Sequence, residues 1–368
     1  MTDRTKGAPR VGIIALQTYD RPGGIQRFNQ RLFGNLAAIF REDGAIARPW
    51  VLLKGDDPAR FDRSLDVDFV EPNRPAKAFV RSAFAAVRRT DILLVGHINL
   101  LPLAVALKAA RPSLRLFLIV HGDEVWDSEG YRRLRWYEPL LLRLVDRIVS
   151  VSGYTSRRMA EKFRVPPGKF FDFLNAVDLI PDRPRAAASE RIALSVTRLT
   201  AGEERKNIQP LVTAFARVVA RWPDAELHII GEGVLKQGLI DHAASLGIAG
   251  SVVFRGYVDD EALEAAYARS TVFALPSDKE GFGIVYLEAW LRNVPVICSD
   301  LGAPATIIDD GVDGWVASRA VDDIAAALIA AFSDQAAADR MGRAGRRKVE
   351  EKYSNAAFRA RLKQLVTG

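Results

Sequence analysis

The sequence predicts an α/β protein made of two Rossmann-like domains, whose parallel sheets face a central cleft. Three observations support this prediction. The chain has 368 residues, more than a single domain of about 150 residues would hold. Short runs rich in Val, Ile and Leu alternate with helical stretches, as parallel strands buried on both faces require. A segment at 180–190, rich in proline, alanine and charge, interrupts this alternation and resembles a linker.

The continuous apolar runs and the helical stretches between them give the order of elements. The predicted strands lie at 11–16, 91–95, 115–120, 147–151, 191–196, 226–230, 251–254, 272–275 and 294–298. The predicted helices lie at 25–40, 103–110, 208–221, 262–269, 285–292 and 354–366. We therefore expect an N-terminal domain at 1–182 and a C-terminal domain at 190–353. The last helix, about 354–368, is expected to join the N-terminal domain.

Composition limits the class of protein. The apolar content of 49% is enough for two ordinary cores, and no apolar run reaches the ~20 residues of a membrane span. A single cysteine, Cys298, excludes an internal disulfide and suits a reducing compartment. We expect a cytoplasmic protein, or one that is peripheral on the inner face of the cell membrane.

The positive charge is concentrated in the first half of the chain. Residues 1–182 hold 29 Lys and Arg against 21 Asp and Glu, whereas residues 183–368 hold 23 against 24. A basic half suggests an anionic partner: membrane lipid, a phosphorylated acceptor or nucleic acid. A basic protein without such a partner is the alternative.

The most informative stretch is 275–290, Leu-Pro-Ser-Asp-Lys-Glu-Gly-Phe-Gly-Ile-Val-Tyr-Leu-Glu-Ala-Trp. Gly281 and Gly283 let the backbone approach a ligand, and the following helix N-terminus favours a phosphate. Glu280 and Glu288 are more suited to hydroxyls of a sugar or ribose than to the phosphate itself. The segment therefore predicts a nucleotide-sugar site.

This segment resembles the signature of glycosyltransferase family 4, in which two glutamates are separated by seven residues around Gly-Phe-Gly. The resemblance covers nearly the whole chain and implies the GT-B fold and a retaining transferase. It implies that Glu280 contacts the donor sugar and that Glu288 holds the ribose. The diphosphate would be bound by the backbone N–H groups of Phe282, Gly283, Ile284 and Val285, and Gly281 is a further donor-binding candidate.

Other segments match the same family. Arg198 and Lys206, in the loop after strand 191–196, correspond to the two cations that neutralise the leaving diphosphate, and Arg205 is a substitute for Lys206. Gly23 and Gly24 resemble a loop beside the donor phosphates. Without the full Gly-x-Gly-x-x-Gly pattern, this turn argues against a nicotinamide dehydrogenase.

Further candidates come from strand ends. By resemblance, His121 faces the reacting sugar, and imidazole can donate or accept a hydrogen bond there. Asp123 and Glu124 are both candidates to accept the acceptor's proton, and the sequence does not choose between them. His97 and Asn99 are secondary candidates for contact with the acceptor. By resemblance, Tyr257 and Val258 are candidates for the pocket that binds the nucleotide base. Thr306 stands where the family usually carries a glutamate, which leaves the geometry of that loop open.

Two arginine-rich stretches are candidates for membrane contact. Residues 131–147 mix arginine, aromatics and leucine, as an interfacial helix does, and residues 79–89 form a second candidate. An ordinary amphipathic helix packed on the sheet is the alternative for both, and we favour it for the first.

We expect a glycosyltransferase that moves a sugar from a UDP- or GDP-type donor to a sugar or lipid-linked acceptor, in surface polysaccharide or glycolipid synthesis. No cofactor and no metal is expected, because no carboxylate cluster has spacing suited to Mg²⁺. The alternatives are a sugar-nucleotide epimerase or a phosphorylase on the same architecture, a nucleic-acid-binding protein and a non-catalytic scaffold. We expect no nucleic acid as a partner, since an aromatic and basic recognition motif is missing.

Overall fold

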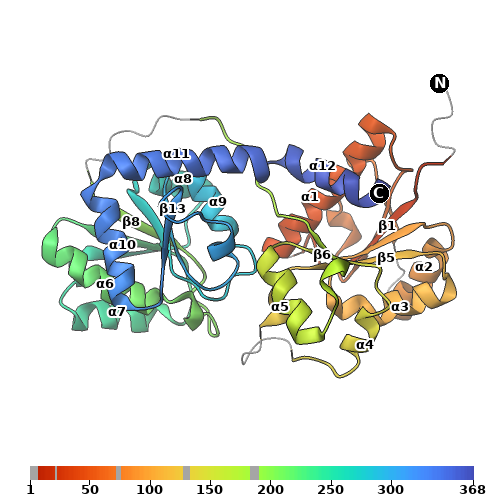
Figure 1. Cartoon of the computed structure of the whole chain (residues 1–368), viewed down its shortest axis with the longest axis horizontal. Helices are drawn as coiled ribbons and strands as arrows, with labels where there is room; N and C mark the ends of the chain where they lie inside the picture. Colours follow the sequence, from red (N-terminus) through yellow and green to blue (C-terminus); the bar gives the residue numbers. More distant parts are fainter. Residues whose placement is uncertain (1–6, 21–22, 72–75, 127–132, 183–189) are drawn as a thin grey trace. The chain divides into compact units, whose positions relative to one another are not determined.

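The structure, a computed structural model, describes residues 7–20, 23–71, 76–126, 133–182 and 190–368. It divides into two compact units (Figure 1). Unit 1 comprises residues up to Ala176 together with Asn355–Gly368, and unit 2 comprises Val177–Ser354. The division therefore falls at 176/177, earlier than the expected 182. Residues 177–182 join unit 2, where Asn293 Nδ2 donates to Asp182 Oδ1 at 2.8 Å. The expected linker residues 183–189 lie outside the described residues.

Unit 1 is built on a seven-stranded parallel sheet in the order β3-β2-β1-β4-β5-β6-β7. Its strands are β1 Val11–Leu16, β2 Trp50–Lys54, β3 Asp68–Phe69, β4 Ile92–Val95, β5 Arg115–Val120, β6 Arg147–Ser150 and β7 Phe170–Asp172. Its α-helices are α1 Gly24–Ala38, α2 Ala76–Val87, α3 Leu101–Ala110, α4 Glu138–Leu142, α5 Gly153–Phe163 and α12 Asn355–Thr367. A π-helical turn, Ile39–Asp43, continues α1.

Unit 2 repeats this plan with six parallel strands in the order β10-β9-β8-β11-β12-β13. Its strands are β8 Ile192–Val196, β9 Glu226–Ile230, β10 Val252–Gly256, β11 Val272–Leu275, β12 Val296–Ser299 and β13 Gly314–Ala317. Its α-helices are α6 Ile208–Arg221, α7 Lys236–Ser245, α8 Asp260–Arg269, α9 Ile284–Trp290, α10 Val321–Ser333 and α11 Gln335–Lys352. Both units thus have the Rossmann-like strand order, in which the fourth strand lies on the other side of the first strand from the second and third.

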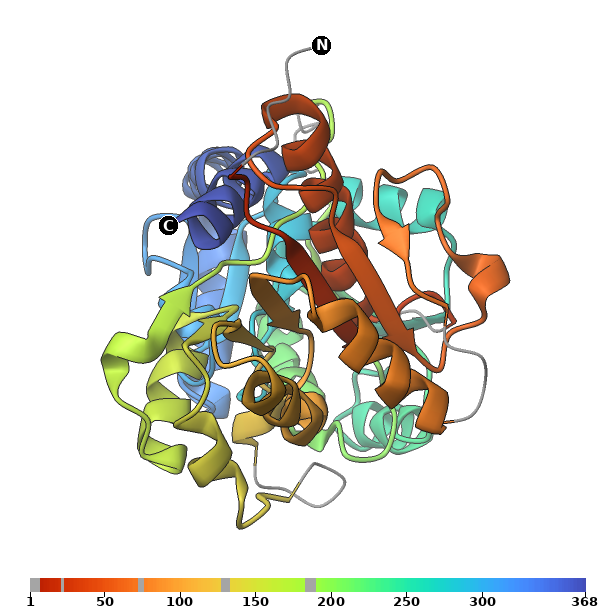
Figure 2. The ribbon, with the colours of Figure 1, turned by 90° about the vertical axis from the view of Figure 1, so that its right-hand side faces the viewer.

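Successive side chains of the strands in unit 1 point to opposite faces of its sheet, so each face carries an apolar core. Ile14, Leu93 and Val95 pack with residues of α2 and α3 in one apolar cluster. On the other side of the sheet, where α1 and α12 lie together (Figure 2), Phe28 of α1 and Phe358 of α12 meet at 5.5 Å between ring centroids. Asn35 Nδ2 of α1 also donates to Asn355 Oδ1 at 2.8 Å. These contacts hold the C-terminal helix in unit 1.

The expected long helix at 131–147 is not formed. Residues 131–132 lie outside the described part of the chain, and within the rest only Glu138–Leu142 is helical. Pro139 explains where this helix begins, because proline fits the first turn of a helix but disrupts a helix when it lies in the interior. The second stretch, 79–89, is largely α2, and its Phe79, Ala83 and Val87 are buried in the apolar cluster. Helix α2 therefore packs on the sheet, as the alternative interpretation expected.

Candidate functional site

The side chains predicted to contact the leaving group and the donor sugar lie where the strand order of unit 2 reverses. Strands β8 and β11 are neighbours at this point, and the loops after them carry Arg198 and Lys206 on one side and Glu280 on the other. In open parallel sheets this carboxyl-terminal edge is where ligands bind. The two loops are joined directly: Asn207 Nδ2 donates to the carbonyl of Pro276 at 2.7 Å.

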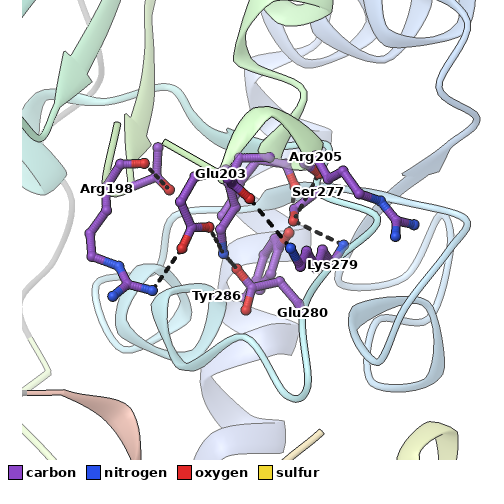
Figure 3. Close-up of polar contacts among 11 residues, drawn as sticks. Arg198, Glu203, Arg205, Ser277, Lys279, Glu280 and Tyr286 are labelled. Carbon is purple, nitrogen blue, oxygen red and sulfur yellow. Dashed lines mark hydrogen bonds and ion pairs between the residues drawn. The ribbon is translucent and has the colours of Figure 1, made fainter. Parts of the chain in front are cut away.

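One buried carboxylate organises the loop after β8 (Figure 3). Glu203 is 7% exposed, and its Oε1 accepts a hydrogen bond from Arg198 Nη2 at 2.8 Å. Its Oε2 lies 3.8 Å from Lys206 Nζ. The side chain of Arg198 remains 76% exposed, so Glu203 fixes its direction while leaving it accessible to a ligand.

Lys206 is bound in turn by the first signature glutamate. Its Nζ forms an ion pair with Glu280 Oε1, and both side chains are largely buried. Burial opposes the charged form of Lys206, but the carboxylates of Glu280 and Glu203 outweigh it and raise the pKa of the ammonium. Lys206 is therefore a cation at neutral pH. The structure thus places Arg198, Lys206 and Glu280 in one cluster together with Glu203.

The loop after β11 is fixed by contacts with the loop after β8. Asp278 is buried, and its Oδ2 lies 3.4 Å from Arg205 Nη2 and 3.5 Å from Arg319 Nη1. Lys279 Nζ donates to the carbonyl of Gly202 at 3.3 Å. Arg205 therefore belongs to this structural contact, whereas Lys206 faces the cluster around Glu280.

Two glycines bring the turn after β9 against the Arg198 loop. A Cβ on Gly231 would lie 1.7 Å from the carbonyl oxygen of Thr197, and one on Gly233 would lie 2.1 Å from that of Leu199. Their φ values of 145° and 151° also favour glycine. The backbone approaches closely here, and Leu199 N donates to the carbonyl of Glu232 at 3.1 Å.

The signature glycine Gly283 is required by both space and backbone angle. Its φ is 88°, and a Cβ would lie 2.6 Å from the ring of Tyr286. Tyr286 is buried, and its hydroxyl donates to the carbonyl of Leu275 at the end of β11. This contact ties α9 to the strand and sets the course of residues 281–285. Glu280 itself is fixed through its carbonyl, which accepts from Ala303 N at 3.0 Å.

The other candidates of unit 2 lie on α9 and in the loops after β10 and β12. Glu288 is half-buried on α9 next to Tyr267, whose hydroxyl pKa is raised well above its usual value by burial and then by the charge of Glu288. Tyr257, directly after β10, is 89% exposed, and Val258 is half-buried. Thr306 is exposed, and its hydroxyl donates to the carbonyl of Ala303 within its own short turn, so it does not replace a glutamate chemically.

Unit 1 brings its two candidate histidines to neighbouring strand ends. His121, after β5, lies with its Nε2 3.1 Å from the carbonyl of Gly96, which follows β4. This contact requires a proton on Nε2 and leaves Nδ1 as an acceptor. Burial lowers the pKa of His121 to about 4 despite the nearby carboxylate of Asp123. The imidazole is therefore neutral at pH 7 and able to accept a hydrogen bond from a hydroxyl.

The structure separates the two carboxylates that the sequence left open. Glu124 is 1% exposed, and its Oε2 accepts from the backbone N–H of Gly122 at 2.8 Å and of His121 at 3.1 Å. Burial and the neighbouring Asp123 hold the pKa of this carboxyl well above its usual range. Glu124 thus shapes the turn rather than facing a substrate.

Asp123 is instead oriented by His97. Its Oδ2 lies 3.2 Å from His97 Nε2, while His97 Nδ1 accepts from Asn99 N at 3.0 Å. Burial opposes ionisation of Asp123, but the interaction with His97 outweighs it and lowers the pKa of the carboxyl. Asp123 is an anion at neutral pH, and Asn99 contributes its backbone N–H to this arrangement.

The glycine pair of unit 1 is less constrained. Gly23 precedes α1 with an extended φ of 167°, which any residue adopts, and a Cβ on Gly24 would meet no heavy atom within 4 Å. Arg21 and Pro22 of the same turn lie outside the described residues. The close backbone approach expected at this pair is therefore not required by its own conformation.

Comparisons with known proteins assign the chain to a family. The family model described as Glycosyl transferases group 1 matches residues 178–348, and the one described as Glycosyltransferase Family 4 matches residues 47–180. A GDP-mannose-dependent alpha-(1-6)-phosphatidylinositol monomannoside mannosyltransferase of Mycolicibacterium smegmatis is 34% identical over 69% of this chain and 70% of its own length. The Mycobacterium tuberculosis protein of the same name is 30% identical over 98% of both chains. The chain belongs to glycosyltransferase family 4.

As a member of this family, the protein is a glycosyltransferase that uses a nucleotide sugar. This result identifies an enzyme and so contradicts the alternative of a non-catalytic scaffold. The fold is GT-B. The Anabaena protein HepE in complex with UDP superposes with a TM-score of 0.77 at 15% identity, over 97% of this chain and 99% of that chain. A lipopolysaccharide outer core galactosyltransferase superposes with a TM-score of 0.75 at 16% identity, over 97% and 99%.

Neither a metal cluster nor a membrane-spanning helix is found in the described ranges. Within the part of the chain that the structure describes, no group of three or more His, Cys, Asp or Glu side chains is placed to hold a metal ion. Among the helices of the described residues, none is long and apolar enough to span a bilayer.

Proposed function

We propose that this glycosyltransferase transfers mannose from GDP-mannose to a hydroxyl of a lipid-linked, phosphoinositide-type acceptor, with retention of the anomeric configuration. These donor and acceptor classes are the ones named for the two mannosyltransferases that are 34% and 30% identical to the chain. A role in glycolipid synthesis follows from that acceptor class. Membership in glycosyltransferase family 4 supports the proposal of retention.

The observation that carries the proposed chemistry is the cluster of Arg198, Glu203, Lys206 and Glu280 in unit 2. When the bond between the anomeric carbon and the donor phosphate breaks, the departing diphosphate gains negative charge. Arg198 and Lys206 are two cations that Glu203 holds in this loop, and cations placed beside the leaving group stabilise its developing charge more than a ground-state phosphate. They also perform the part that a divalent cation would otherwise perform, so we propose a metal-independent reaction.

Glu280 and Lys206 change partners when the donor binds. In the free protein, Glu280 is occupied by the ammonium of Lys206. A donor diphosphate would draw Lys206 towards itself, and the carboxylate of Glu280 would then accept hydrogen bonds from hydroxyls of the mannose. Glu203 keeps contact with both cations during this exchange, and so holds them in the loop.

We propose that unit 1 supplies the acceptor side through His121 and Asp123. His121 is neutral and offers Nδ1 as an acceptor to a sugar hydroxyl. Asp123 is an oriented anion. Glu124 is assigned no part in the transfer, because its oxygens are occupied by backbone N–H groups.

A panel of donors with one lipid acceptor tests this function. The purified chain is incubated in EDTA with GDP-mannose, UDP-glucose or ADP-glucose and with a phosphatidylinositol mannoside, and the glycolipid product is analysed by NMR for the anomeric configuration. We expect an α-linked mannosyl product from GDP-mannose. A product from UDP-glucose but not GDP-mannose would overturn the proposed donor, and a requirement for added Mg²⁺ would overturn metal independence.

A further inference from the structure

Large apolar side chains are exposed together in one short stretch of unit 1. Trp136 is 83% exposed, and Leu134, Leu140 and Leu144 are 42%, 53% and 51% exposed. These four residues, together with Arg133, Arg135, Arg143 and Arg147, are called the Trp136 surface below. Helix α4, in the middle of the stretch, lies at the lower edge of unit 1 in Figure 1.

Buried side chains and hydrogen bonds hold this stretch against the rest of unit 1, so its apolar residues are exposed in a fixed conformation. Leu142 is fully buried and Glu138 is 1% exposed, and a carboxylate oxygen of Glu138 accepts from Arg135 N at 3.1 Å. On the next turn, Lys169 Nζ donates to the carbonyls of Arg143 at 2.5 Å and Val145 at 2.9 Å. Leu140 and Leu144, four residues apart, are therefore held outward on the face opposite to Leu142.

The charges around these apolar groups have one sign. Arg133, Arg135, Arg143 and Arg147 are exposed. The acidic residues between 133 and 147 are Glu138, which is buried, and Asp146, whose Oδ2 is bound by Lys108 Nζ at 2.5 Å and by Leu116 N at 2.6 Å. The accessible charge of the Trp136 surface is therefore positive.

We propose that the Trp136 surface docks the protein on an anionic lipid bilayer. Tryptophan and leucine enter the boundary between headgroups and acyl chains, and arginine is attracted to anionic headgroups. A second copy of the chain is a poor occupant, because a two-fold contact would place the arginines of one copy against those of the other. The proposal rests on unit 1 alone and stands whether the donor is GDP-mannose or another nucleotide sugar.

Sedimentation of the full chain with vesicles tests the proposal. The vesicles are pure phosphatidylcholine, or phosphatidylcholine with about 30% phosphatidylglycerol to supply the anionic surface. One variant, Trp136→Ser with Leu140→Ser, removes apolar contacts, and another, Arg133→Glu with Arg143→Glu, reverses two charges. The matched control is Arg343→Glu with Arg347→Glu, which makes the same change of charge on exposed positions of α11 in unit 2.

We expect the wild type and the control to bind the anionic vesicles and not the neutral ones. Each variant of the Trp136 surface should lower the partition coefficient at least about tenfold, with an unchanged melting temperature and unchanged nucleotide binding. Equal binding of wild type to both vesicles, or wild-type binding by the surface variants, would overturn the proposal. Light scattering could also overturn the proposal. A wild-type dimer that becomes a monomer in the Trp136→Ser, Leu140→Ser variant would show that the surface binds a second copy of the chain.

Discussion

The ammonium of Lys206 and the carboxylate of Glu280 form an ion pair between two loops that are 74 residues apart in the sequence. The pair joins the loop after β8 to the loop after β11 at the centre of one parallel sheet. The proposed roles of the two partners differ, since Lys206 stabilises the departing diphosphate and Glu280 contacts the sugar. The contact therefore keeps both groups in position until a donor separates them.

Removal of one partner of this pair should cost both stability and turnover. Lys206→Met leaves Glu280, 16% exposed, without its cation, and we expect a loss of about 2 kcal/mol in the free energy of unfolding of unit 2 and of about 10²–10³ in kcat. The double variant Lys206→Met, Glu280→Gln should recover the stability but not the turnover. Chemical denaturation and rates of GDP release measure the two effects. Recovery of turnover in the double variant would contradict the proposed roles.

Glu203→Gln should lower kcat by about tenfold, because a charged hydrogen bond that directs Arg198 becomes a weaker neutral one. The adjacent Glu204→Gln makes the same chemical change at an exposed residue and should behave as wild type. Steady-state kinetics with GDP-mannose compares the two variants. Equal effects of both substitutions would show that Glu203 acts only through the general charge of the loop.

The close approach at Gly231 gives a prediction with a matched control. Gly231→Ala places a Cβ against the Thr197 carbonyl and should displace the Arg198 loop, with a loss of about 2 kcal/mol or more in stability and weaker nucleotide binding. Gly238→Ala lies at an open position inside α7 and should add about 0.5–1 kcal/mol. Melting temperatures and GDP titrations test both changes. A Gly231→Ala variant with wild-type GDP affinity would contradict this account of the loop.

His121 should make the protein less stable below neutral pH. Its pKa is lowered to about 4 in the folded chain, against about 6.5 unfolded, so the unfolded state binds more protons between these values and stability falls as pH decreases through this window. At pH 5 the loss from this residue is at most about 2 kcal/mol. His121→Asn should shrink the difference between melting temperatures at pH 7.5 and pH 5. A ring NMR titration with a midpoint near 6.5 would refute the prediction directly.

The sequence predicted the fold well wherever strands are buried on both faces. Strands such as β1 and β11 are continuous apolar runs, and their predicted bounds match the structure. Strand β7, by contrast, has three residues, and its two phenylalanines are only half-buried. It therefore forms no continuous apolar run in the sequence. The prediction of a long helix at 131–147 was wrong. It relied on the arginine and leucine residues of this stretch and did not use Pro139, the one residue that restricts where a helix can begin.

At the site, the sequence identified residues but not their partners. The resemblance to the family pointed to Arg198, Lys206 and Glu280, which lie in the loops after β8 and β11. Glu203 was overlooked as one of two adjacent glutamates, and only the fold shows that it is buried while Glu204 is exposed. The choice between Asp123 and Glu124 likewise depends on side-chain direction, which adjacent residues in a tight turn do not reveal.

The central claim is that Arg198 and its neighbours in unit 2 bind the diphosphate of the donor without a metal. The most direct test is calorimetric titration of GDP, with UDP and ADP in parallel, in EDTA, into wild type, Arg198→Ala and Arg217→Ala. Arg217 pairs with Asp322 elsewhere in unit 2 and serves as the matched control. We predict that wild type and Arg217→Ala bind GDP equally and that Arg198→Ala binds at least about tenfold more weakly. Absence of binding by the folded wild type to any of the three nucleotides, or unchanged affinity in Arg198→Ala, would contradict the claim.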